Sequence, residues 1–464
     1  MIDSIINVTR NRYCIIAIFS IIFTLSFQGY HDFLWSLILP LVSIFFASTL
    51  YSFYKDSGEK QFILFTFFWA LLFRVIMVYA MSEILYHYNG MPFLSDKDDF
   101  VYNNAAINIM KRWQFMGFGF YEDLQFSSDS YSGFPNFSAA LMSVFGTSHI
   151  VPRIGNAVLS SATVLISYLI LKSFSDKEKA RFTTSILITL PMTMVFAAMQ
   201  FKDTLLLFFI IIGVYASVNI IQNRKILFSI LLLMVALIGC SFGRPAVIVP
   251  IILALLVSLI FGFLSKSKSN TIIKVLALLV VFYLALNAYQ ILHSMGFVSM
   301  EEYFDSRFEI LSEGDIQDTS ANIRNTSIAT YLGAPLYIIL GLFLPAPLIV
   351  QIEDILRYDA WIVLAHYAFI PILIVSIWQS IINRNTSPTP FYIFLVYLFL
   401  RIGQANSILT SFSPRQSLAT LYLMYLLIPM YKSNMKNWET AFICTSIFMI
   451  VLYNAVRLYS HGML

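Results

Sequence analysis

Long runs of apolar residues recur from one end of the chain to the other, separated by short polar connections. A run of about 17 or more such residues is long enough to cross the hydrocarbon core of a bilayer as a helix. Counting these runs predicts about 13 transmembrane helices, over residues 13–29, 33–54, 61–85, 151–172, 183–201, 204–222, 226–241, 246–264, 271–292, 359–382, 391–412, 416–431 and 439–458. The pattern therefore predicts an all-α integral membrane protein.

Composition supports this class. Of the 464 residues, 59% are hydrophobic and only 12% are charged, which is about half the charged fraction of soluble domains. The 29 basic residues are offset by 25 acidic ones and lie in short clusters, so the charge argues against a nucleic-acid partner. We expect a single polytopic domain over residues 1–464, surrounded by membrane lipids.

Lysine and arginine indicate the orientation, because they collect in cytoplasmic loops. With the N-terminus inside, the basic clusters fall on the inner side through nine successive spans. Counting residues 329–352 as one more span would move Arg384, Lys432 and Lys436 outside, so we expect a re-entrant or broken segment there. The prediction is a multi-pass protein of the inner (cytoplasmic) membrane with a cytoplasmic N-terminus.

The two long connections, residues 86–150 and 293–328, then lie on the outer face, where most acidic residues also lie. Within the first, residues 99–113 and 136–146 alternate apolar and polar side chains at helical spacing and predict helices lying in the membrane interface. Long loops carry function more often than short ones. We therefore expect an active site that faces the periplasm or the exterior.

Three carboxylates follow the third span in "SDKDDFVYNNA", namely Asp96, Asp98 and Asp99, and Tyr102 lies one turn further on. Carboxylates this close repel one another unless something binds them. One of them could act as a general base while a neighbour orients it or binds a cation. The alternative is an acidic first turn of a helix, where aspartate is favoured by capping and by the helix dipole.

A second acid, Asp203, lies beside Lys202 in a short turn between two spans, on the same predicted side as Asp98. Charges near hydrocarbon are costly, which favours a functional role. A helix cap and a snorkelling lysine are the structural alternative. Guanidinium groups bind phosphate in bidentate fashion, and an anionic substrate group is predicted by the outward arginines Arg153, Arg244, Arg307, Arg324 and Arg415.

Two further arginines, Arg74 and Arg401, lie deep within predicted spans. An intramembrane charge is a functional hypothesis by default, and pairing with an acid or with backbone carbonyls is the structural alternative. The chain has no HExxH pair, no P-loop and no GxGxxG after a strand. No motif therefore supports nucleotide-driven chemistry, and none identifies a cofactor with certainty.

Together these features resemble the GT-C superfamily of membrane glycosyltransferases, which includes the protein O-mannosyltransferases and the lipid A aminoarabinose transferases. Its members share many spans, a long first outer loop with interfacial helices and an acidic motif at the start of that loop. "SDKDDFVYNNA" resembles this motif, and residues 134–172 resemble the Pro-led helix and Arg-bearing span that follow it. "LPMTMVFAAMQFKDTLLLFF" resembles the span pair whose outer turn holds a second acid, here Asp203.

The resemblance implies a polyprenyl-phosphate-linked sugar donor, such as an undecaprenyl phosphate sugar, and a single displacement at the anomeric carbon. Asp98 or Asp99 would deprotonate the acceptor hydroxyl, and Asp203 would be the second catalytic acid. The leaving phosphate would be stabilised by preorganised cations. The predicted substrate-binding residues are Asp96, Tyr102, Arg153, Lys202, Arg244, Arg324, Arg415, Arg74 and Arg401. A divalent cation, Mg or Mn, is left open, with Asp98, Asp99 and Asp203 as its ligands.

The sequence lacks the WWDYG signature of the oligosaccharyltransferases and has no large C-terminal soluble domain. We therefore expect the acceptor to be a lipid-linked glycan or a cell-surface polysaccharide such as O-antigen, rather than a protein. One alternative is a polymerase of surface-polysaccharide repeat units that uses polyprenyl-pyrophosphate oligosaccharides. A second is a lipid-linked oligosaccharide flippase or transporter, with Arg74 and Arg401 along its path.

Overall fold

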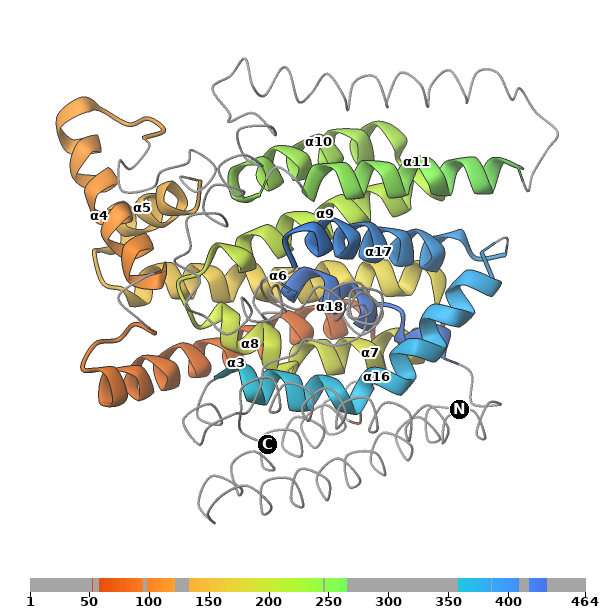
Figure 1. Ribbon diagram of the computed structural model, residues 1–464, viewed down its shortest axis with the longest axis horizontal. Coiled ribbons are helices and arrows are strands. Elements are labelled where there is room, and N and C mark those ends of the chain that lie inside the picture. The colour runs from red at the N-terminus through yellow and green to blue at the C-terminus, as the bar shows by residue number, and fades with distance from the viewer. Residues whose placement is uncertain are drawn as a thin grey trace, which may run out of the picture.

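The computed structural model describes residue 52 and residues 58–94, 98–121, 133–244, 247–264, 358–384, 386–408 and 417–431. Within these residues the chain forms helices and no strands (Figure 1), which confirms the all-α class. The count of 13 spans stays a prediction. Several expectations lie outside the described residues, namely Asp96, Arg307, Arg324, Arg415, residues 293–352 and the spans at 13–29, 33–54, 271–292 and 439–458.

Long apolar helices form the bundle at the positions that the apolar runs predict. Four helices in the described part are long and apolar enough to cross a membrane, or five if one bent pair is counted. The four are α3 (Glu59–Asn89), α6 (Ile150–Phe174), α9 (Lys202–Ile221) and α10 (Ile226–Gly243). The bundle also contains α11 (Ile248–Leu264), α16 (Tyr358–Ile382), α17 (Pro388–Ile408), α18 (Leu418–Tyr425) and the 3-10 helix η4 (Ile428–Met430).

The continuous span predicted over residues 183–201 is broken. The structure has α7 (Lys177–Ile188) and α8 (Pro191–Ala197), which meet at an angle of 45°. Pro191 is the cause, because it has no N–H to donate to the helix and forces the preceding residue out of helical conformation. Leu190 accordingly has an extended backbone, with φ −65° and ψ 112°. After α8, residues 198–201 lead the chain into the start of α9.

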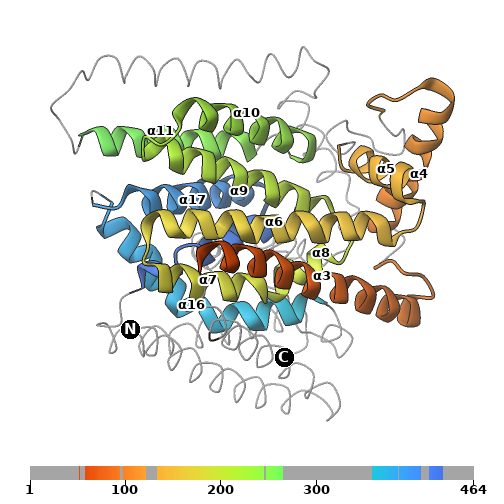
Figure 2. The ribbon, with the colours of Figure 1, turned by 180° about the vertical axis from the view of Figure 1, so that it is seen from behind.

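The helix α6 lies in the middle of the bundle and contacts α3, α7, α8 and α9. Figures 1 and 2 show α3, α6, α9 and α17 running roughly alongside one another, with α4 (Asp98–Met116) and α5 (Gly133–Phe145) projecting at one end. We call this the α4–α5 end. Both helices form where the first long loop predicts them, and their placement in a membrane interface stays a prediction.

The other end of the bundle carries most of the exposed lysines and arginines. There Lys172 at the end of α6 forms an ion pair with Glu59 at the start of α3. Gln222 joins the ends of α6 and α9 to the start of α17 by donating to the carbonyl of Ser173 and to Thr389 Oγ1. We call this the basic end, after Lys60, Lys172, Lys177, Lys179, Arg224, Lys225 and Arg384.

Close packing of α9 against α10 makes a direct prediction about stability. A Cβ atom added at Gly239 would lie 2.2 Å from Cδ1 of Phe209, whereas one added at Gly213 would lie 3.5 Å from its nearest neighbour, the Cβ of Ala236. We expect Gly239→Ala to destabilise the fold by about 1–3 kcal/mol through overpacking. Thermal unfolding in detergent would measure this as a lower Tm, with Gly213→Ala as the matched control. Equal Tm values for the two variants would contradict this account of the contact.

Candidate active site

A buried ion pair joins the first long loop to the bundle. The Nη2 atom of Arg153, on the first turn of α6, lies 3.9 Å from Oδ2 of Asp99 on α4, and both side chains are fully buried. The same Nη2 donates to the carbonyl oxygen of Pro92, and the guanidinium carbon lies 5.5 Å from the ring centre of Phe93. A buried carboxylate needs such a partner, because desolvation of an unpaired charge is expensive.

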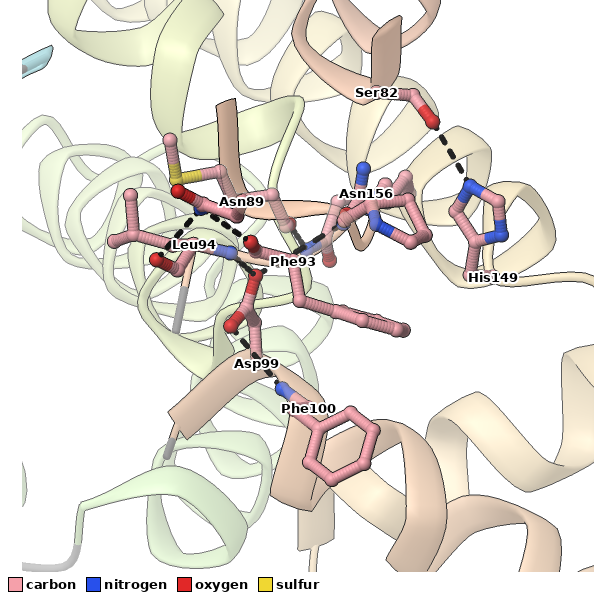
Figure 3. Close-up of polar contacts among 11 residues, drawn as sticks. Ser82, Asn89, Phe93, Leu94, Asp99, Phe100, His149 and Asn156 are labelled. Atoms are coloured by element: carbon pink, nitrogen blue, oxygen red, sulfur yellow. Dashed lines mark hydrogen bonds and ion pairs between the residues drawn. The ribbon is translucent and has the colours of Figure 1, made fainter. Parts of the chain in front are cut away.

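The carboxylate of Asp99 is also fixed by backbone donors (Figure 3). Its Oδ2 accepts a hydrogen bond of 2.8 Å from the backbone N–H of Leu94, and its Oδ1 accepts one of 3.1 Å from that of Phe100. Asp98 is the first residue of α4, and the structure describes only its backbone. Asp99 is therefore the acid of the predicted cluster whose surroundings are defined.

The segment between α3 and α4 is clamped to the end of α3. Asn89 Nδ2 donates to the carbonyl oxygens of Phe93 and Leu94 at 2.9 and 3.1 Å. Together with the bond from Arg153 to Pro92, these contacts fix the backbone that in turn holds Asp99 (Figure 3). The site is thus preorganised from both sides of the carboxylate.

His149 lies beside this segment. One of its ring nitrogens is 2.9 Å from Ser82 Oγ, and its ring stands edge-on to Phe93 with centroids 5.9 Å apart. Burial lowers the pKa of His149 below its ordinary value, and the positive charge of Arg153 lowers it further. Both effects favour the neutral imidazole next to the ion pair, because they disfavour its charged form.

A second polar residue of α6 holds the turn that carries the second acid. Asn156 Nδ2 donates to the carbonyl oxygens of Met199 and Phe201 at 2.9 and 3.1 Å. Arg153 and Asn156 are three residues apart, so they lie on the same face of α6. One helical turn thus holds both acid-bearing segments, α4 through Arg153 and the start of α9 through Asn156.

Lys202 and Asp203 are the first two residues of α9, and they are only 4% and 5% exposed. Fully charged side chains are rarely this buried in proteins. Asp203 lies in the first turn of α9, where the helix dipole stabilises a negative charge. Burial at this depth favours a role for both residues in the candidate site over the alternative of a lysine that snorkels to the membrane surface.

Aromatic packing brings the first-loop helices to the start of α9. Tyr102 of α4 is 3% exposed and stands edge-on to Phe134 of α5, with ring centroids 5.4 Å apart. Both rings belong to one buried cluster with Leu205, which lies two residues after Asp203. The predicted site residues Asp99, Tyr102, Arg153, Lys202 and Asp203 are therefore gathered at the α4–α5 end.

Arg244, which follows α10, lies at the same end. It caps the C-terminus of α10, and its backbone N–H donates to the carbonyl of Cys240. Two residues earlier, Phe242 packs against Phe120. A Cβ atom added at Gly133 would lie 2.3 Å from the backbone oxygen of Phe242, so only glycine allows this close approach. This contact fixes the end of α10 against the start of α5 and leaves Arg244 partly exposed beside it.

Arg74 is placed deeper in the bundle. It is fully buried and donates five hydrogen bonds, to Ser160 Oγ, Thr193 Oγ1 and the carbonyl oxygens of Ala70, Leu187 and Ile188. Two of these carbonyls end α7, where a cation is favourable. The geometry thus favours the structural alternative for Arg74. Arg401 of α17 is 3% exposed and donates to Ser417 Oγ at 2.7 Å.

A divalent cation stays a prediction. Within the described ranges no three His, Cys, Asp or Glu side chains come together as metal ligands. Asp99 instead lies beside a cation of the protein, Arg153, which neutralises part of the charge that a metal ion would otherwise neutralise.

Three residues of the site, Asn89, His149 and Asn156, were missed by sequence reasoning. Polar side chains close to a predicted membrane surface are common and carry no motif of their own. Asn156, however, is an amide inside an apolar run, and a polar residue at that depth is a signal that could have found it.

The comparisons with known proteins support the same class. Residues 133–289 match the family model described as dolichyl-phosphate-mannose-protein mannosyltransferase. A comparison with curated proteins gave no match. The matched segment contains Arg153, Asn156, Lys202, Asp203 and Arg244, whereas Asp99 precedes it.

This match over residues 133–289, together with the apolar helices, supports a membrane glycosyltransferase of the GT-C superfamily.

Proposed function

We propose that this protein transfers a sugar from a polyprenyl-phosphate-linked donor to a lipid-linked glycan or a cell-surface polysaccharide. The observation that carries the proposal is the buried Asp99–Arg153 pair, which lies at the same end of the bundle as Lys202 and Asp203. The matched family, described by its mannosyl donor on dolichyl phosphate, supports a polyprenyl-phosphate donor, with mannose as the first sugar to test.

The proposed reaction is a single displacement. Asp99, or its neighbour Asp98, takes the proton of the acceptor hydroxyl as the oxygen attacks the anomeric carbon. The bond between that carbon and the phosphate oxygen breaks, and the electron pair leaves with the polyprenyl phosphate. Lys202 and Arg244 lie at the correct end to stabilise the charge that develops on this leaving group.

We propose that the site faces the periplasm or the exterior. Basic residues of a membrane protein collect on the cytoplasmic side, and in this bundle they collect at the end opposite Asp99. A carrier lipid also suits a site that lies at the end of the membrane-spanning helices, because the polyprenyl chain can then remain in the bilayer.

Gel analysis of surface glycan tests this function. Cells that lack the gene would be compared with cells restored with the wild type or with Asp99→Asn. We expect a ladder that keeps its length and shifts at every rung, with the shift corrected by the wild type alone. Collapse to a single repeat would instead mean a polymerase, and loss of the whole ladder would mean a flippase. An unchanged ladder would remove surface glycan as the substrate.

A further inference from the structure

The turn between α8 and α9 is buried along its whole length. Met199 and Gln200 have no exposed surface, and Phe201 is 1% exposed. Turns that connect membrane-spanning helices normally meet water, because backbone polar groups need hydrogen-bond partners. Here Asn156 supplies two of those partners, through the carbonyls on either side of Gln200. The turn is therefore buried against the face of α6 that carries Asn156, rather than lying on an outer surface of the bundle.

Gln200 itself is buried without hydrogen bonds. Neither Nε2 nor Oε1 of its carboxamide has a partner in the part of the chain that the structure describes. Each buried unpaired polar group costs about 1–3 kcal/mol, so an apolar side chain of the same size would be more stable there. Buried polar groups are normally hydrogen-bonded. A protein that keeps an unpaired one next to a candidate functional site does so for a reason other than stability.

Asn156, which holds the turn, and Arg153 on the same face of α6 also carry unpaired polar atoms. The amide oxygen of Asn156 has no partner among the described residues, and neither do Nε and Nη1 of Arg153. These two side chains lie on the face of α6 that holds the turn. Among the described residues, the first turns of α6 and the turn that Asn156 holds thus carry two unpaired acceptor oxygens and several unpaired N–H donors.

The chemistry of these atoms selects the ligand. A carboxamide offers a donor and an acceptor together, and a hydroxyl group complements both because it also accepts and donates. A phosphate only accepts at its ionised oxygens and would leave Gln200 Oε1 unpaired. A polyprenyl chain would leave both atoms unpaired. Sugar hydroxyls are the part of the proposed donor that satisfies the whole set.

We propose that Gln200, with the amide oxygen of Asn156, binds hydroxyl groups of the sugar being transferred and so sets the sugar specificity of the enzyme. The proposal rests on the proposed function and adds a substrate-binding residue to it. Gln200 precedes Lys202 by two residues and Asp203 by three. This order places the sugar contact next to the cation expected at the leaving phosphate.

The first test is Gln200→Met, which keeps the length of the side chain and removes its polar atoms. We expect the Tm to stay the same or rise, and kcat/KM for transfer from polyprenyl-phosphate mannose to fall by at least about tenfold. The matched control is Thr183→Val on α7, which removes another buried and unpaired polar atom near the basic end. We expect this control to leave kcat/KM unchanged.

The second test uses a series of donors that each lack one sugar hydroxyl. In the wild type, the donor that lacks the contacted hydroxyl should lose rate, and Gln200→Met should add little further loss with that donor. A uniform loss across all donors would mean that Gln200 only shapes the turn, and it would overturn the inference. Gln200→Glu serves in the same donor series if the methionine variant does not accumulate in the membrane.

The outcomes separate the two claims. Full activity of Gln200→Met beside an active wild type would overturn this inference and leave the proposed function standing. A wild-type enzyme that transfers no sugar from any polyprenyl-phosphate donor would overturn the proposed function, and this inference with it.

Discussion

Asp99→Asn is expected to abolish sugar transfer while the protein still folds and inserts. A general base contributes about 10²–10⁴-fold to a reaction rate, so kcat should fall by at least about 100-fold. Asparagine has the shape of aspartate but cannot take up the proton of the acceptor hydroxyl. The measurement is single-turnover transfer by the purified variant in detergent, together with the yield of folded protein.

The buried partner of Asp99 makes the controls important. Removing the carboxylate leaves the guanidinium of Arg153 without the negative charge that lies 3.9 Å away, which by itself lowers stability. The double variant Asp99→Asn with Arg153→Met removes both charges, and we expect it to regain stability without regaining transfer. Asp176→Asn, whose side chain is 82% exposed at the basic end, should leave both properties unchanged. Transfer at the wild-type rate in Asp99→Asn would remove Asp99 from the mechanism and leave Asp98 as the base.

Arg74→Met is expected to have the largest effect on stability. The substitution removes the donor to the carbonyls of Leu187 and Ile188, which end α7, and to the hydroxyls of Ser160 and Thr193. Several buried acceptors then lose their partner at about 1–3 kcal/mol each, partly offset because methionine carries no charge to desolvate. We expect a net loss of about 2–5 kcal/mol and a Tm lower by at least about 5 °C.

The same variant separates the two roles considered for Arg74. If the arginine is structural, the folded fraction of Arg74→Met should keep the donor KM of the wild type. Thr193→Val removes only one of the five acceptors and should show a much smaller fall in Tm. An unchanged Tm together with a large increase in KM would show that Arg74 binds substrate.

Much of the bundle could be predicted from the sequence, because burial in a bilayer imposes long apolar runs on a helix. The runs at 61–85, 151–172, 204–222 and 226–241 match α3, α6, α9 and α10 to within a few residues. The break before α8 was missed, although Pro191 is visible in the sequence and marks it. Hydropathy alone does not register the loss of one backbone donor within an apolar run.

Part of the candidate site could be predicted as well. Asp99 stands out in a cluster of three carboxylates, Arg153 as one of several outward arginines, and Asp203 because a charge beside hydrocarbon is expensive. That they share one side was predicted, but their mutual contacts could not be, since those contacts depend on which face of α6 points towards the first loop and towards the turn before α9. Gln200 carries no charge and no motif, and only its lack of partners in the folded chain distinguishes it.

The placement of α4 and α5 has a consequence for how such enzymes diverge. Among the described residues, these two helices contact the bundle along the first turns of α6, near the start of α9 and at Phe242. Side chains of α4 and α5 that lie outside these contacts, such as the exposed Phe115 and Val144, can change without repacking the membrane-spanning helices. Under the proposed function, such changes offer a route to new acceptors that leaves α6 and α9 unchanged.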